Sequence, residues 1–257
     1  MNKLFQDLKR MAVCPDSFAK SVFAEENMNF FSRPFLMPAI MFLMYSLLAA
    51  LELLFVPPEF FGVISGVPMS LSSPVYVILI VSILGNAFTT FAVSSLLSVY
   101  LPYIGNGRLA FRLALLFVII PALYALLSLM PLPLSASIII SVAAFMALFV
   151  PVFKKKHTFL SMLYCFFMFS SLLLIFEILQ FLPIFANLPK LYLALQMLSA
   201  AVSLVYSVAF IKGVSGLSSA KSFAAFISAG ILVMVFLWSL QISGIISPEI
   251  SQILSLS

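Results

Sequence analysis

Residues 158–181 read TFLSMLYCFFMFSSLLLIFEILQF, and Glu177 carries the only charge among them. An apolar run of about 18 or more residues with few charges is long enough to cross the hydrocarbon core of a bilayer as a helix. A helix is the expected structure there because every backbone polar group in hydrocarbon needs a partner within the segment. This stretch therefore predicts a transmembrane helix.

The rest of the chain repeats this pattern. Hydrophobic residues make up 64% of the sequence and charged residues 8%, whereas a soluble domain has about 45–50% and about 25%. So few polar residues cannot cover a soluble globule. The apolar runs predict an all-α, polytopic integral membrane helix bundle with about seven spans: Phe35–Val56, Val75–Leu101, Leu109–Met130, Ser135–Val152, Thr158–Phe181, Leu191–Ile211 and Phe223–Ile246. The fourth run is short, and it either tilts across the bilayer or enters it only part-way.

Basic residues mark the predicted orientation of the bundle. All 13 Lys and Arg residues except Lys190 lie in the N-terminal stretch or in and beside alternate connections between the spans. Connections rich in Lys and Arg stay in the cytoplasm. We therefore expect the N-terminus in the cytoplasm and, since the number of spans is odd, the C-terminus outside.

The first 33 residues are predicted to form a cytoplasmic interfacial segment that precedes the transmembrane domain at 34–257. Apolar residues recur there at helical spacing, namely Leu4, Phe5, Leu8, Met11 and Ala12. This spacing, with charges on the other faces, is typical of an amphipathic helix in a membrane interface. A second short helix is predicted from Pro15 onward, with an apolar stripe of Phe18, Val22 and Phe23. These helices either lie among the cytoplasmic headgroups or pack against the protein's own cytoplasmic end.

Three stretches of the sequence resemble the Yip family of polytopic membrane proteins. They are CPDSFAK at 14–20 followed by RPFLMP at 33–38, FAVSSLLSVYLPYIGNGRLAFRLALLFVIIPALYALL at 91–127, and LVYSVAFIKGVSGLSSAKSFAAF at 204–226. The family is named for binding Ypt/Rab GTPases and is usually described with five spans, so the resemblance implies that residues 131–181 are an insertion. The short N-terminus is similar to that of the prokaryotic branch, which implies the cytoplasmic (inner) membrane of a bacterium.

Residues that carry enzymatic chemistry are sparse. The chain has one histidine, His157, which follows three lysines, whereas a metal site needs several converging ligands. It has no phosphate-binding loop and no dinucleotide fingerprint. The basic residues serve orientation, so the net charge of +5 does not indicate a nucleic-acid partner. We expect a protein that is not an enzyme and that has no cofactor and no metal.

Two carboxylates, Glu52 and Glu177, fall within predicted spans. A charged side chain in the bilayer costs about 2.5–3.5 kcal/mol or more, so such groups are candidates for function. Both stand near the outer ends of their spans. They either face the headgroups or a neighbouring helix dipole, or they line a shared outward-facing vestibule that recognises a cationic ligand or a proton.

The other polar residues of interest fall into two groups. The first is interpreted as interhelical hydrogen-bonding groups and comprises Asn86, Thr89, Thr90, Gln180 and Gln196. The second is a basic ring predicted at the cytoplasmic face, made of Arg108, Arg112, Lys154, Lys155, Lys156, Lys212 and Lys221. The ring either serves orientation alone or binds anionic lipid or an acidic partner.

Two functions are compatible with these patterns. The first is a non-enzymatic, Yip-like integral membrane protein that organises a membrane-bound complex or the local bilayer, with membrane lipids and a protein partner or a second copy of itself as partners. The alternative is a transporter or permease subunit for a lipid or a small hydrophobic solute. A water-accessible cavity that reaches Glu177 favours the alternative, and a solidly packed interior favours the first.

Overall fold

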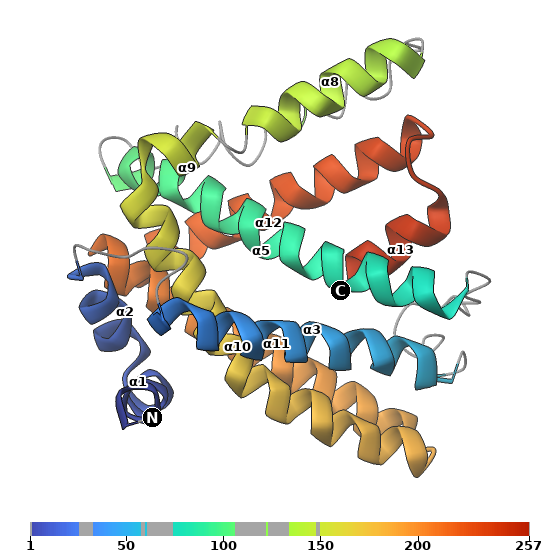
Figure 1. Ribbon diagram of the computed structural model, residues 1–257, viewed down its shortest axis with the longest axis horizontal. Coiled ribbons are helices and arrows are strands. Elements are labelled where there is room, and N and C mark those ends of the chain that lie inside the picture. The colour runs from blue at the N-terminus through green and yellow to red at the C-terminus, as the bar shows by residue number, and fades with distance from the viewer. Residues whose placement is uncertain are drawn as a thin grey trace.

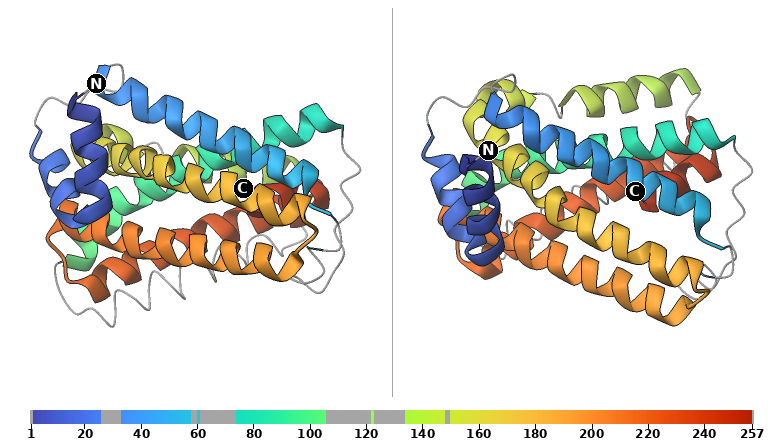
Figure 2. Two further views of the ribbon diagram at one scale, coloured as in Figure 1. Left: turned by 90° about the horizontal axis from the view of Figure 1, so that it is seen from below. Right: turned by 60° about the horizontal axis from the view of Figure 1, so that its bottom comes forward.

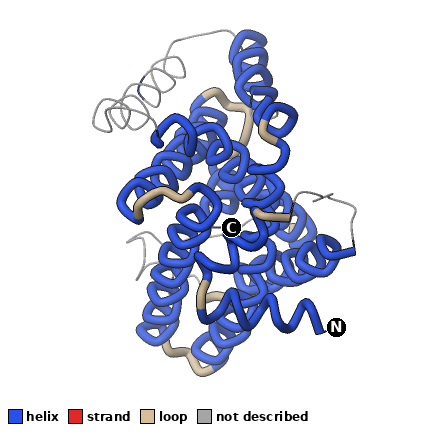
Figure 3. Tube along the Cα trace, turned by 90° about the vertical axis from the view of Figure 1, so that its left-hand side faces the viewer, coloured by secondary structure: helices blue, strands red, loops and turns tan. Residues whose placement is uncertain are grey.

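The computed structural model describes residues 2–25, 33–57, 60, 74–105, 122, 134–147 and 150–256. Within these residues the chain is helical, with short turns between the helices and no strand (Figure 3). The prediction of an all-α protein is therefore confirmed. The long helices are apolar all around their circumference, as expected of helices that are surrounded by lipid instead of water.

Five helices are long and apolar enough to cross a membrane: α3 (Arg33–Phe55), α5 (Val75–Gly105), α10 (Lys156–Phe185), α11 (Pro189–Ser215) and α12 (Ser219–Ile242). They correspond to five of the predicted spans and differ from them by a few residues at each end. The five helices run roughly along the long axis of the molecule, and α12 crosses α5 at an angle (Figures 1 and 2). The protein is thus a helical membrane bundle.

The two remaining predicted spans have different outcomes. Leu109–Met130 lies outside the described residues, apart from residue 122. The predicted helix Ser135–Val152 corresponds to two shorter helices, α8 (Leu134–Ala147) and α9 (Val150–Lys154). Pro151 lacks the amide that a continuous helix needs to bond the carbonyl group of residue 147. With 14 residues, α8 is shorter than the roughly 20 residues of a typical span.

Helix α10 is the centre of the bundle, packed against α3, α5 and α11. Aromatic rings fill these interfaces: Phe167 of α10 stacks on Phe42 of α3 at 4.6 Å between ring centroids, and Phe169 stacks on Tyr206 of α11 at 5.0 Å. Ring pairs of this kind add about 0.5–1.5 kcal/mol beyond the burial of their surface. In a membrane, where lipid is as apolar as the side chains, such packing contributes much of the stability.

The two N-terminal helices, α1 (Asn2–Val13) and α2 (Pro15–Phe23), cover one end of the bundle. Helix α2 packs against α11 and α10, with Phe18 buried between Tyr164 and Phe210. Helix α1 lies crosswise over the same end (Figure 2); its Met11 is buried while Phe5 is 72% exposed. The sequence left open whether these helices lie among the headgroups or pack against the protein. Helix α2 packs against the protein, whereas α1 has one face packed and one face exposed.

The described basic side chains of the predicted ring lie at this same end. Lys154, Lys155 and Lys156 stand where α9 meets α10, and Lys212 and Lys221 flank the turn from α11 to α12. These helix ends are gathered around α1 and α2 (Figure 1). At the opposite end α13 (Pro248–Leu256) folds back against α5 and α12.

Candidate functional site: a buried carboxyl pair beside a central cavity

The two carboxylates of the spans meet inside the bundle. Glu52 of α3 is 4% exposed and Glu177 of α10 is 6% exposed, and the two side chains interact with each other. Both acids are therefore buried within the protein. They meet because α3 and α10 form the most extensive helix pair of the bundle and each turns its acid toward the other.

Helix α11 contributes an amide to this pair. Gln196 Nε2 donates to Glu52 Oε1 at 2.9 Å and lies 3.1 Å from the hydroxyl oxygen of Tyr192, one turn earlier on the same helix. Three spanning helices that are distant in sequence are therefore joined through one set of side-chain hydrogen bonds. We call Glu52, Glu177, Gln180, Tyr192 and Gln196 the carboxyl cluster.

Gln180 completes the carboxyl cluster from the turn of α10 that follows Glu177. With its amide nitrogen toward Glu52, it donates to Oε1 at 2.6 Å and to Oε2 at 2.7 Å. With its amide oxygen in that place, it accepts from Gln196 Nε2 at 2.8 Å. The Gln180 amide thus fits either a charged or a neutral Glu52, because it offers a donor in one orientation and an acceptor in the other.

The electrostatics of the carboxyl cluster call for a positive charge. Two carboxylates in contact and shielded from water repel each other strongly, and a shared proton or a bound cation removes that repulsion. Among the described residues the basic side chains stand on α1, on α2 or near the ends of α9, α10, α11 and α12, and none is a partner of the pair. Glu177 Oε2 is buried and has no hydrogen-bond partner. The carboxyl cluster therefore has an open acceptor position.

A cavity of about 210 Å³ lies further toward the middle of the bundle than the carboxyl cluster; Tyr45 is among its lining residues, and Glu52 and Glu177 are not. We call it the central cavity, because all five long helices contribute to its wall. Its polar lining consists of Tyr45, Asn86, Thr89, Thr90, Ser170, Ser203 and Ser207. Polar groups that converge in a pocket between helices are typical of a ligand site.

The central cavity and the carboxyl cluster share helix faces. Tyr45 precedes Glu52 by seven residues on α3, Ser170 precedes Glu177 by seven on α10, and Ser203 follows Gln196 by seven on α11. Seven residues are nearly two helical turns, or about 10.5 Å along the axis. All three offsets lead from one end of the bundle toward its middle. Helix α11 runs antiparallel to α3 and α10, so on α11 the cavity residue follows the cluster residue in sequence, whereas on the other two helices it precedes it.

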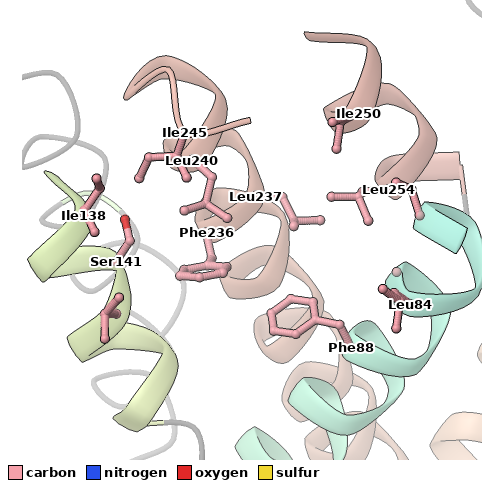
Figure 4. Close-up of a pocket in the computed structure, with 13 residues that line it drawn as sticks. Leu84, Phe88, Ile138, Ser141, Phe236, Leu237, Leu240, Ile245, Ile250 and Leu254 are labelled. Atoms are coloured by element: carbon pink, nitrogen blue, oxygen red, sulfur yellow. The ribbon is translucent and has the colours of Figure 1, made fainter. Parts of the chain in front are cut away.

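A second cavity differs from the first in its chemistry. It has a volume of about 440 Å³ and lies between α5, α8, α12 and α13, where Phe88, Phe236 and Leu237 face into it (Figure 4). Apart from Ser141, its lining side chains are apolar. It offers no polar group that would orient a ligand, so it is the weaker candidate for a specific site.

The predicted basic ring does not converge on one point. Lys154, Lys155 and Lys156 are exposed, and Lys212 makes an exposed ion pair at 3.4 Å with Asp16 of α2. Arg108 and Arg112 lie outside the described residues. The neighbouring His157 is 3.1 Å from the carbonyl oxygen of Glu25, which places its ring at the end of the α2 segment. Within the described part of the chain no three His, Cys or acidic side chains are grouped as a metal site requires.

From the sequence, Gln180, Gln196, Asn86 and the two threonines were interpreted as helix-packing groups. Tyr45 and Tyr192 were not predicted as part of the site. A signal for them was present on α11, where polar residues recur every three or four positions: Tyr192, Gln196, Ser199, Ser203 and Ser207. This spacing gives an apolar helix one polar stripe. The stripe indicates a polar interior, although it does not identify the helices that complete it.

The chain matches no family model, no curated protein and no solved structure, so the resemblance to the Yip family stays a prediction and the site rests on its own geometry.

Proposed function

We propose that this protein is a non-enzymatic membrane transporter, or the membrane subunit of a permease, that carries a small hydrophobic solute through the central cavity. One observation carries the proposal: five long helices surround a polar cavity, about two helical turns from a buried pair of carboxyl groups on the same helix faces. A bundle that serves only as a scaffold has no need of acids in hydrocarbon, where each charge is costly.

The position of the central cavity supports carriage. Ser170, Ser203 and Thr90 stand near the midpoints of α10, α11 and α5. Transporters commonly place their substrate site near the bilayer midplane, where motion of the surrounding helices opens it to either side. Both the central cavity and the carboxyl cluster lie between helices rather than on one helix, so relative helix motion alters them.

The proposal includes a topology of seven spans with the N-terminus in the cytoplasm and the C-terminus outside. The described Lys residues around α1 and α2 support this orientation, and Lys190 lies at the opposite end, in the first turn of α11. The carboxyl cluster then lies toward the outer side. The membrane is the cytoplasmic membrane of a bacterium, as the resemblance to the prokaryotic Yip branch implies.

Cysteine accessibility tests the proposed function. Ser203→Cys is introduced into protein that also carries Cys14→Ser and Cys165→Ala, which remove both native thiols. Aminoethyl methanethiosulfonate, a water-soluble reagent that reacts with ionised thiols, is then applied to the protein in lipid nanodiscs. We expect labelling of Ser203→Cys, because a cavity used for transport is hydrated and a hydrated thiol ionises.

Val205→Cys is the matched control, since it stands at almost the same depth on α11 with a 63% exposed, lipid-facing side chain. It should stay unlabelled because lipid neither solvates the thiolate nor admits the reagent. Labelling of neither cysteine would indicate a closed, packed interior and would count against transport.

The first function predicted from the sequence, a Yip-like organiser of a complex or of the bilayer, retains support from one feature. Helix α1 presents the exposed side chains of Phe5 and Val13 beside Lys9 and Arg10 at the basic end of the bundle. That combination suits anionic headgroups or a protein partner. Gentle extraction with native lipids followed by mass spectrometry tests it: a reproducible protein partner supports the organiser, and its absence argues against it.

A further inference from the structure

The chemistry of the central cavity specifies a ligand more narrowly than a hydrophobic solute. Its apolar wall is largely aromatic, formed by Phe42, Phe166, Phe169 and Phe226 together with Tyr45. Aromatic faces attract cations within about 6 Å, and desolvation strengthens that attraction. A purely aliphatic ligand would gain nothing from this wall over lipid.

Two unpartnered polar atoms add direction to the site. Glu177 Oε2 lies in the carboxyl cluster and Asn86 Nδ2 lies on the wall of the central cavity; both side chains are at least nine-tenths buried, and neither atom has a hydrogen-bond partner. A buried polar group without a partner costs about 1–3 kcal/mol. A ligand that supplies a donor to Glu177 satisfies that group, and the face of an aromatic ring accepts weakly from the Asn86 amide.

The charge of the carboxyl cluster selects the sign of the ligand. Glu52 receives a donor from Gln196, while Glu177 has no cationic partner among the described residues. An ammonium group beside Glu177 neutralises the pair as a proton does. Tyr45 belongs to the aromatic wall and lies on the same face of α3 as Glu52, about two helical turns away, so an organic group attached to the ammonium extends along this face toward the central cavity.

Resting on the proposed transport function, we propose that the carboxyl cluster and the central cavity together bind one small organic monocation, an ammonium that bears an aromatic group. The ammonium takes the place of the proton shared by Glu52 and Glu177. The ring occupies the aromatic part of the central cavity. The size agrees with this class, because about 210 Å³ is below the roughly 300–1,000 Å³ of sites for drug-sized ligands.

The test uses two probes of nearly the same shape, 2-phenylethylammonium and the neutral 2-phenylethanol, titrated calorimetrically into the full-length protein in lipid nanodiscs. We expect the ammonium to bind and the alcohol to bind at least about tenfold more weakly, as loss of a charge-assisted hydrogen bond implies. This comparison is made on the wild-type protein, so it holds even if a variant fails to fold.

Variants locate the site. Glu177→Gln removes one acidic group while keeping the shape, and we expect it to weaken binding of the ammonium by about tenfold or more. Glu52→Gln is the second variant at the pair and should have the same direction of effect. Glu249→Gln is the matched control, since this acid lies on α13 outside the carboxyl cluster, and it should leave the affinity unchanged.

The possible results separate this inference from the proposed function. Equal binding of the two probes, or an unchanged affinity in Glu177→Gln, overturns the cationic ligand. Absence of binding by both probes while Ser203→Cys is labelled overturns the ligand class and leaves transport standing. Absence of binding together with an unlabelled Ser203→Cys overturns both.

Discussion

Gln196 on α11 donates to Glu52 on α3 at 2.9 Å, across 144 residues of sequence and inside a bundle of apolar helices. The bond joins two helices that otherwise have little direct packing, since α3 and α11 contact each other mainly through α10. It also supplies a donor to one member of the carboxyl pair. The stability of the carboxyl cluster and its proposed function therefore depend on the same side chain.

Replacing Gln196 with leucine should destabilise the protein by about 1–3 kcal/mol, because Glu52 Oε1 then loses its buried donor. Thermal unfolding in detergent, followed by circular dichroism, measures the change. Met197→Leu is the control, since its side chain is 65% exposed to lipid on the same helix; it should stay within about 0.5 kcal/mol. Equal stability of the two variants would show that the bond contributes nothing.

Replacing both acids together, Glu52→Gln with Glu177→Gln, should raise the stability of the ligand-free protein by about 0.5–2 kcal/mol, as removal of functional strain commonly does. The neutral amides keep the shape of the site and remove its need for a shared proton or a bound cation. Thermal unfolding and titration with 2-phenylethylammonium are measured on the same preparation. A stabilised variant that still binds the ammonium would contradict the role assigned to the pair.

Gly213 allows α2 to approach α11. A Cβ atom at this position would overlap the carbonyl oxygen of Asp16 and lie 2.7 Å from the Cβ of Ala19. We expect Gly213→Ala to weaken docking of α2 by about 1–3 kcal/mol, because backbone cannot yield as a flexible side chain does. Hydrogen exchange of the α2 amides measures it. Gly230→Ala on α12 has no neighbouring atom within 4 Å and should leave α2 protected.

Phe18 anchors the same helix by its ring. It is 1% exposed and contacts Tyr164 and Phe210. We therefore expect Phe18→Ala to weaken the docking of α2 on the bundle by about 3–5 kcal/mol. Limited trypsin digestion at Lys20 provides the measurement, with faster cleavage expected. Phe5→Ala removes an exposed ring of α1 and serves as the comparison. If both changes accelerate cleavage at Lys20 equally, the Phe18 ring does not hold α2 on the bundle.

The ion pair between Asp16 and Lys212 makes a weaker contribution at the same interface. Both side chains are nearly half exposed, and ion pairs of this kind typically contribute about 0–1 kcal/mol. We therefore expect Lys212→Ala to change α2 protection much less than Gly213→Ala does. A loss as large as that of Phe18→Ala would mean that charge, rather than packing, holds α2.

Local properties of the chain were readable from its sequence. The run at 158–181 became α10, and the predicted helix with Phe18 and Val22 on one stripe became α2. Hydropathy and periodicity over neighbouring residues decide such elements. The predicted helix at 135–152 corresponds to α8 and α9, between which residues 148–149 lie outside the described part of the chain.

The sequence by itself determined that this protein is an α-helical membrane protein, because an excess of apolar residues in long runs leaves lipid as the only suitable surroundings. It also singled out Glu52 and Glu177 as costly residues in those runs. Only the tertiary structure decided that they meet, that Gln196 reaches them, and that Tyr45 and Asn86 share a cavity beside them. Such meetings depend on how each helix is rotated and packed against the others, and hydropathy along one helix carries no information about the rotation of its neighbours.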